Sequence, residues 1–186
     1  KGLGSRRIFF DKKIKENIYE VIEPKLSDEE KEIKKKLTYY FRTRTDSTDV
    51  SNMDKKQKEK YLEESLDKIV AENHIKLDAE SKDNIFYYIL QDFIGFSKID
   101  IIMDDEGIED IHCDGLNVPL YIHHRLFESI KTNIIFKDVE ELDSFVIKLS
   151  QICGKQISVY EPIVDGKLGD GSRLQTTLGN TVTKYS

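Results

Sequence analysis

The sequence predicts an α+β fold, with a helical N-terminal part followed by an antiparallel sheet that one helix crosses. Apolar residues recur at helical spacing between residues 33 and 93, and from Gly107 onward they alternate with polar residues as in half-buried strands. An amphipathic stretch over 139–153 interrupts this alternation. The expected segments are an N-terminal β-hairpin and lead-in over 1–24, a helical subdomain over 25–106, and a sheet with one helix over 107–186.

The first elements follow from local signals. Two strand-like stretches, 7–10 and 17–22, flank a charged connector and predict a hairpin that Pro24 ends. Ser27 and Glu30 then have the spacing of a capping box, which predicts the start of a helix.

The rest of the helical part has a clear apolar period. Helices are expected over 54–73 and 78–93, and a shorter helical piece over 97–105. Residues 42–52 have no such period and many turn-forming residues, so we assign them no structure.

Three alternating stretches predict strands over 108–115, 119–125 and 127–136. Asp138 should cap the next helix, with Glu141 completing the box and Gly154 closing it. Its apolar face should contain Val139, Leu142, Val146, Leu149 and Cys153. Two further strands should fold over a Gly169-Asp170-Gly171 turn in which both glycines have positive φ, and Gly179-Asn180 should turn the chain again.

Composition restricts the partners and the location. Charged residues make up 34% of the 186 residues with a net charge of −6, and both signs are mixed, which is typical of solvated surface and predicts no nucleic-acid partner. Two cysteines without a Cys-x-x-Cys spacing, and no apolar leader, indicate a cytoplasmic protein. With no run of eighteen apolar residues, any membrane association should be peripheral.

Two clusters contain residue types that bind metals, but no metal is expected at either. His112, Cys113, His123 and His124 are zinc-ligand types, but adjacent strand residues point to opposite faces and do not easily converge on one ion. The carboxylates over 104–114 lack the ligand period and central glycine of a calcium loop.

Arg173 is the principal candidate for a binding residue. It follows a glycine-containing turn, where a planar, permanently charged guanidinium can be offered to a phosphate or carboxylate of another domain or subunit. The alternative is an ordinary exposed strand arginine. The sequence contains no Gly-x-x-x-x-Gly-Lys-Ser/Thr, Gly-x-Gly-x-x-Gly or His-Glu-x-x-His motif, so these residues alone are not predicted to form an enzyme.

Three blocks in order give the chain a resemblance to a known family: "IEDIHCDGLNVPLYIHHRLFESIKTNI", "EELDSFVIKLSQICGKQIS" and "PIVDGKLGDGSR". From about Tyr19 onward the chain resembles the N-terminal domain of archaeal ATPases of the type II secretion, type IV secretion, pilus-assembly and archaellum motor superfamily. The family commonly has proline where this chain has Gly169.

The resemblance implies a hexameric ring ATPase that uses ATP and Mg²⁺. It implies that a RecA-like domain with the nucleotide-binding motifs follows these residues, that neighbouring subunits of a homohexamer contact them, and that the ring docks on a membrane platform protein. Arg173 would reach the ATP phosphates from this domain, and Arg125, in "HHRLFES", is a second candidate for cofactor binding. Two other functions stay open: a free-standing ligand-sensing module, since a curved sheet crossed by a helix is PAS-like, and an adaptor without a nucleotide role.

Overall fold

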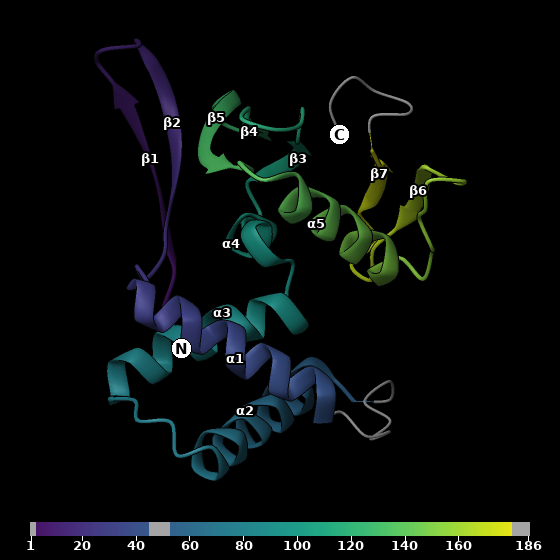
Figure 1. Cartoon of the computed structure of the whole chain (residues 1–186). Coiled ribbons are helices and arrows are strands. Elements are labelled where there is room, and N and C mark those ends of the chain that lie inside the picture. Colours follow the sequence, from purple (N-terminus) through teal and green to yellow (C-terminus); the bar gives the residue numbers. More distant parts are fainter. Residues whose placement is uncertain (1–2, 45–52, 180–186) are drawn as a thin grey trace. The chain divides into compact units, whose positions relative to one another are not determined.

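The computed structural model describes residues 3–44 and 53–179, which form two compact units (Figure 1). The first unit contains the described residues up to Ser5 together with Ile22–Ile101. The second contains Arg6–Val21 and the described residues from Ile102 onward. The α+β class predicted from the sequence is confirmed.

The first unit is a helical layer around one apolar cluster. Its helices are α1 (Asp28–Arg44), α2 (Lys55–Glu72) and α3 (Ala79–Phe93), followed by the short η1 (Ser97–Ile99). The boundary between the two units falls within the next helix, α4 (Asp100–Met103). The cluster is formed by the apolar stripes that the sequence period predicted, and its buried members are Leu37, Phe41, Leu62, Leu66, Ile69, Ile85, Phe86 and Ile89. Residues 45–52, most of the stretch to which the sequence assigns no structure, lie outside the described residues, whereas 42–44 complete α1.

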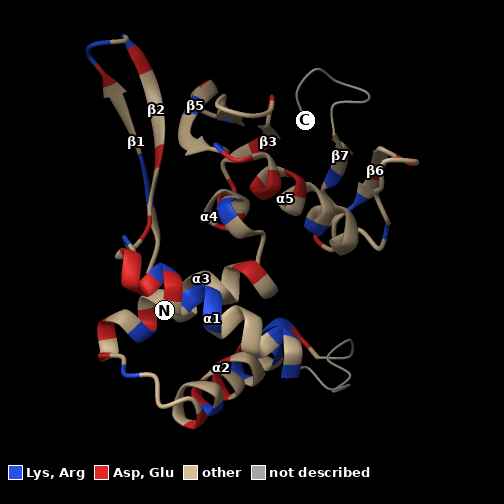
Figure 2. Cartoon of the chain, in the orientation of Figure 1, with Lys and Arg blue, Asp and Glu red and all other residues tan. Residues whose placement is uncertain are grey.

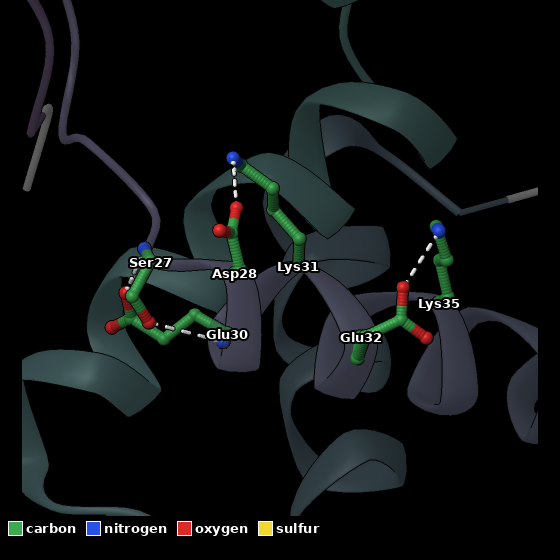
Figure 3. A network of polar contacts seen from close by, with 6 residues as sticks. All are labelled: Ser27, Asp28, Glu30, Lys31, Glu32 and Lys35. Atoms are coloured by element: carbon green, nitrogen blue, oxygen red, sulfur yellow. Dashed lines mark hydrogen bonds and ion pairs between the residues drawn. The ribbon is translucent and has the colours of Figure 1, made fainter.

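The start of α1 has the predicted capping box (Figure 3). The Ser27 N–H donates to Glu30 Oε2 at 2.6 Å, and the Glu30 N–H donates to Ser27 Oγ at 3.2 Å. These bonds satisfy two of the backbone donors that a helix start leaves without partners.

The second unit contains a five-stranded sheet with the order β1-β2-β5-β4-β3. Its strands are β1 (Ser5–Asp11), β2 (Glu16–Ile22), β3 (Ile108–His112), β4 (Pro119–His124) and β5 (Glu128–Ile135). The N-terminal hairpin belongs to this unit from Arg6 to Val21. The sheet is mixed, not antiparallel throughout, because β2 pairs in parallel with β5 at Ile18 and Tyr19 only.

Two contacts join β2 to distant parts of the chain. The Asn133 side-chain amide receives the Val21 N–H and donates to the Val21 carbonyl oxygen, both at 2.8 Å. The Tyr19 hydroxyl, on a completely buried side chain, donates to Asp105 Oδ2 at 2.9 Å. Both contacts attach β2 to the rest of this unit in addition to its short ladder.

Helix α5 (Val139–Ile152) follows β5 and packs against the second, two-stranded sheet, which consists of β6 (Ile163–Lys167) and β7 (Arg173–Thr177). As predicted, Asp138 caps α5, accepting from the Glu140 and Glu141 N–H groups. Leu142, Val146 and Leu149 are buried. Val139 was predicted on the same face but is 50% exposed, because it is the first residue of the helix and lies outside the packed turns.

Acidic and basic residues both occur along α1 and α2 instead of separating into faces of one sign (Figure 2). In the part of the chain that the structure describes, no helix is long and apolar enough to cross a membrane.

Candidate anion-binding site

The β6–β7 hairpin places Arg173 at the first position of β7, directly after a tight turn. The Leu168 N–H donates to the Ser172 carbonyl oxygen at 2.8 Å, and the Gly171 N–H donates to the Leu168 carbonyl oxygen at 3.0 Å. Gly171 has φ 93°, which favours glycine. Gly169 was expected to have positive φ as well but does not, so this turn requires one glycine and not two.

Strand alternation gives the hairpin a buried face and an exposed face. Val164 is buried, and Leu174, which is partly buried, lies on the same side. The opposite side carries four exposed polar residues, which we call the Arg173 face: Asp165, Lys167, Arg173 and Gln175.

On the Arg173 face, the guanidinium of Arg173 is held by the carboxylate of Asp165. Nε donates to Oδ1 at 3.1 Å and one terminal nitrogen donates to Oδ2 at 2.7 Å, a two-point contact between two planar groups. Asp165 is paired with Gln175 across the ladder and Arg173 with Lys167, so the contact is diagonal. The Arg173 side chain is 69% exposed, which leaves the rest of the guanidinium open to solvent.

Two lysines add positive charge around this ion pair. Lys167 lies directly opposite Arg173 in the ladder. Lys155, just after α5, donates from Nζ to the backbone carbonyl oxygen of Asp165 at 2.5 Å. Arg173, Lys155 and Lys167 outnumber the two local carboxylates, Asp165 and the turn residue Asp170, by one, and this small excess of positive charge favours an anion.

The ion pair shifts the protonation equilibria of both partners. The hydrogen bond from Arg173 lowers the pKa of Asp165, and the charges of Arg173 and Lys155 lower it further. The same hydrogen bond and the charge of Asp165 raise the pKa of Arg173. Both groups are therefore fully charged at neutral pH.

An exposed apolar strip lies at the beginning of the same hairpin. Ile163, on the alternation side of Asp165 and Lys167, is 56% exposed. Shortly before it, Val159 and Tyr160 are 70% and 96% exposed, in a turn closed by the Ser158 N–H donating to the Glu161 carbonyl oxygen. Three large apolar side chains exposed within five residues form an apolar patch of the kind that marks an interaction site.

The second predicted binding residue, Arg125, lies elsewhere. It follows β4 in the five-stranded sheet, its backbone N–H donates to the Gly107 carbonyl oxygen, and its Nε lies 3.4 Å from Glu109 Oε1. Arg125 and Arg173 are therefore on different sheets with different acidic partners.

The side chains considered as zinc ligands separate as strand alternation predicted. His124 is buried and accepts the Leu126 N–H at Nδ1, whereas the half-exposed His123 lies 3.7 Å from Glu109. Within residues 3–44 and 53–179, no three histidine, cysteine or carboxylate side chains gather to hold a metal ion.

The sequence predicts Arg173 as a candidate, but not the neighbouring Asp165, Lys155 and Lys167. A signal for two of them was present: once the turn fixes the ladder register, Asp165 and Lys167 lie on the same face as Arg173. Lys155 carried no such signal, because its approach to Asp165 depends on how α5 packs.

Comparison with known proteins gives three relatives in the archaeon Methanocaldococcus jannaschii. The chain is 41% identical to the uncharacterized protein MJ1288 over 182 residues, which are 98% of this chain and 72% of that protein. The chain belongs to the MJ1288 family. No protein-family model matches it.

Two relatives share a smaller part with this member of the MJ1288 family. The uncharacterized protein MJ0900 is 34% identical over 113 residues, 61% of this chain but 20% of that protein. The uncharacterized protein MJ0781 is 28% identical over 109 residues, 54% of this chain and 15% of that protein. The matched region is therefore a small part of two longer proteins and most of MJ1288.

Proposed function

We propose that this chain is the N-terminal domain of a secretion or pilus-assembly ATPase, and that its Arg173 face contacts the phosphates of ATP bound by a RecA-like domain. The observation that carries this proposal is the two-point Asp165–Arg173 contact on an exposed face with two further cations. A carboxylate and a phosphate offer the guanidinium the same geometry. Asp165 is therefore the resting partner that a phosphate replaces.

Replacement of Asp165 by a phosphate would let this domain respond to whether ATP is bound. Without nucleotide, Asp165 compensates the charge of Arg173 and fixes its direction. With ATP present, Arg173 turns to the γ-phosphate, where a guanidinium stabilises the charge that develops during phosphoryl transfer. Asp165 is then left beside Lys155, whose Nζ already bonds its backbone.

The apolar strip beside the Arg173 face favours a protein as the carrier of the phosphate. A free phosphate or nucleotide would leave Val159, Tyr160 and Ile163 in water, whereas a domain docking over the hairpin would cover them. The phosphate-binding loop and Mg²⁺ would come from that RecA-like domain.

The lengths of the relatives suggest two ways of supplying that domain. Just over a quarter of MJ1288 lies outside the region that matches this chain. That remainder has fewer than half as many residues as this chain contains. A doubly wound nucleotide-binding domain needs about 150 residues, at roughly 30 for each strand–helix unit. Four fifths of MJ0900 lies outside its match, which leaves room for such a domain in the same chain. In a short member, the domain would come from another chain.

The remaining partners of the proposal are the neighbouring subunits of a homohexamer and a membrane platform protein at the cytoplasmic face of a membrane. Movement of this domain as a rigid body on ATP binding would transmit the nucleotide state to that platform. Arg125 stays a second candidate for phosphate binding, but away from the Arg173 face, because its partner is Glu109 on the other sheet.

The test is ATP turnover by the full-length protein, or, if that protein lacks a Gly-x-x-x-x-Gly-Lys-Ser/Thr motif, stimulation of turnover by a longer relative that carries one. Arg173→Ala should lower the rate on the order of 10³-fold, as loss of an arginine finger does. Arg44→Ala is the matched control, since Arg44 is an exposed arginine paired with Glu72 in the other unit. Equal rates for both variants, or no turnover in either setting, would remove the proposal.

A second candidate function, an adaptor without a nucleotide role, is favoured by one observation: Asp165 already satisfies Arg173 inside this chain. In that case the pair stabilises the hairpin only. Arg173→Ala would leave ATP turnover unchanged while Tyr160→Ala weakened partner binding.

A further inference from the structure

The N-terminal hairpin ends in an arm that buries almost nothing. Only Ile18 and Tyr19 of β2 pair with β5, and the hairpin's turn lies beyond the end of β5 in Figure 1. Phe9, Phe10 and Ile14 are all exposed, Phe10 by 57%. A two-stranded ribbon without a covered apolar face is only marginally stable by itself. Contact with another surface would therefore stabilise the arm.

Strand β1 is also an edge of the five-stranded sheet, and the two edges differ. At the other edge, β3 has five residues, carries Glu109 and Asp110, and has an irregular register with β4. Short length, charge and irregular pairing all discourage strand addition. β1 has seven residues, contains no proline and carries two adjacent exposed phenylalanines, and its two arginines are each paired with a carboxylate of the same chain.

We propose that β1 pairs antiparallel with β1 of a second copy of this chain, about a two-fold axis at Ile8. The axis is perpendicular to the sheet, so each residue meets one on the same face, and every residue from Ser5 to Asp11 gains a partner. The pairing joins two five-stranded sheets into one continuous sheet.

The side chains of β1 are self-complementary in this register. Arg7 faces Phe9 of the second copy and Arg6 faces Phe10, while Ile8 faces its own equivalent. Within one chain, the Arg7 guanidinium already lies 5.2 Å from the Phe9 ring centroid, so the arginine–phenylalanine contact suits this strand. Cross-strand aromatic pairs of this kind stabilise a ladder.

The charges do not oppose the pairing, because each copy compensates its own arginines. Arg6 Nε lies 2.7 Å from Asp105 Oδ2, and Arg7 Nε contacts Glu20. The lysines of the hairpin turn lie at opposite ends of the antiparallel pair. Sliding the register by two residues in either direction shortens the overlap from seven paired residues to five. One slide also opposes Arg7 to Arg7, whereas the other opposes Phe9 to Phe9 and Arg7 to Asp11, so that its shorter overlap alone disfavours it.

The position of Ile8 on the axis provides a sharp test in the full-length protein. Ile8→Lys and Ile8→Glu each place two like charges opposite one another, so each variant alone should raise the dissociation constant of the pair on the order of tenfold or more. An equal mixture of the two variants should restore association, because Lys then faces Glu. Sedimentation velocity or energy transfer between labelled variants measures this, and thermal melting checks that each variant is folded.

Crosslinking gives a second readout that does not depend on any other assembly contact. With Cys113 and Cys153 replaced by serine, Ile8→Cys should form a disulfide between two copies, since directly opposite strand residues have Cα atoms within the range of a disulfide. Ile14→Cys is the control, because Ile14 is more exposed than the partly buried Ile8 but lies in the turn, past the end of the partner strand. No crosslink at Ile8, equal crosslinking at Ile14, or a Lys–Glu mixture that stays dissociated would overturn the proposal.

Discussion

The Tyr19 hydroxyl and the Asp105 carboxylate, 86 residues apart in the chain, are joined by a hydrogen bond of 2.9 Å. The same carboxylate oxygen contacts Arg6 Nε at 2.7 Å, and the other oxygen accepts the Gly107 N–H at 3.0 Å. One carboxylate thus connects both strands of the N-terminal hairpin to the segment before β3. Burial and the hydrogen bond to Asp105 raise the pKa of Tyr19, so the hydroxyl remains a donor.

Tyr19→Phe should lower the free energy of unfolding by about 1 kcal/mol, because it removes one hydrogen bond but keeps the packed ring. Urea unfolding of both proteins measures the difference. Tyr39→Phe is the control, since Tyr39 is 64% exposed. An equal loss in the two variants would contradict a specific role for the Tyr19–Asp105 bond.

Asp105 should make stability depend on pH at the acidic end. Burial raises the pKa of Asp105, but the Gly107 N–H, the Tyr19 hydroxyl and Arg6 together lower it below the ordinary value of 3.8. A carboxylate with a lowered folded-state pKa stabilises the fold above its unfolded-state pKa, and the contribution disappears as pH falls through the folded-state value. Stability should therefore fall below about pH 3.8, and Asp105→Asn should flatten this dependence. A variant that keeps the wild-type slope would assign the effect to other carboxylates.

Gly107→Ala should destabilise the protein by roughly 1–3 kcal/mol, the usual range for overpacking a filled site. A Cβ at Gly107 would lie 2.5 Å from Nε2 of His124, whose ring is buried and cannot easily move. Gly169→Ala is the control, because its Cβ would meet nothing within 4 Å and its backbone is not left-handed. Adding His124→Ala should cost less in the Gly107→Ala background than alone, since the clash disappears. Additive costs would show that the two positions are independent.

Asp165→Asn should strengthen the binding of a non-hydrolysable ATP analogue by the nucleotide-binding assembly several-fold. The amide no longer holds the guanidinium as a charged partner, so Arg173 reaches the phosphate without breaking an ion pair. Stability should change little, because exposed ion pairs contribute little. Titration calorimetry decides the question, and weaker binding by the variant would exclude the exchange of Asp165 for phosphate.

Arg173→Lys should restore little of the turnover lost in Arg173→Ala. Lysine retains the charge but lacks the planar group that contacts two oxygens at once. Turnover at saturating ATP, compared with melting temperature, separates catalysis from stability. Near-normal turnover in the lysine variant would show that charge alone suffices at this position.

Local chemistry made much of the fold predictable. Ser27 and Glu30 predicted the start of α1, because both halves of a capping box lie within one helical turn. The parallel pairing of Ile18 with Lys131 had no such signal, since a hairpin gives the same alternation whichever strand lies beside it.

The candidate site was predictable to the same extent. The turn and the strand alternation were enough to predict Arg173 as a candidate. Its diagonal contact with Asp165 could be predicted only with the ladder register, and the contact of Lys155 only with the packing of α5. Side chains brought together by tertiary packing leave no pattern in a single sequence.

The Asn133–Val21 contact sets an order of events during synthesis. The side-chain amide of Asn133 substitutes for a peptide group beside β2, but the two residues are separated by 112 positions. A ribosome adds about 5–20 residues per second, so the hairpin segment is synthesised roughly 6–22 seconds before its neighbour. During that interval the side of β2 that later receives β5 is uncovered as well as the edge of β1. The nascent chain therefore passes through a state with two uncovered strand edges. Chaperone binding should be most favourable in that state.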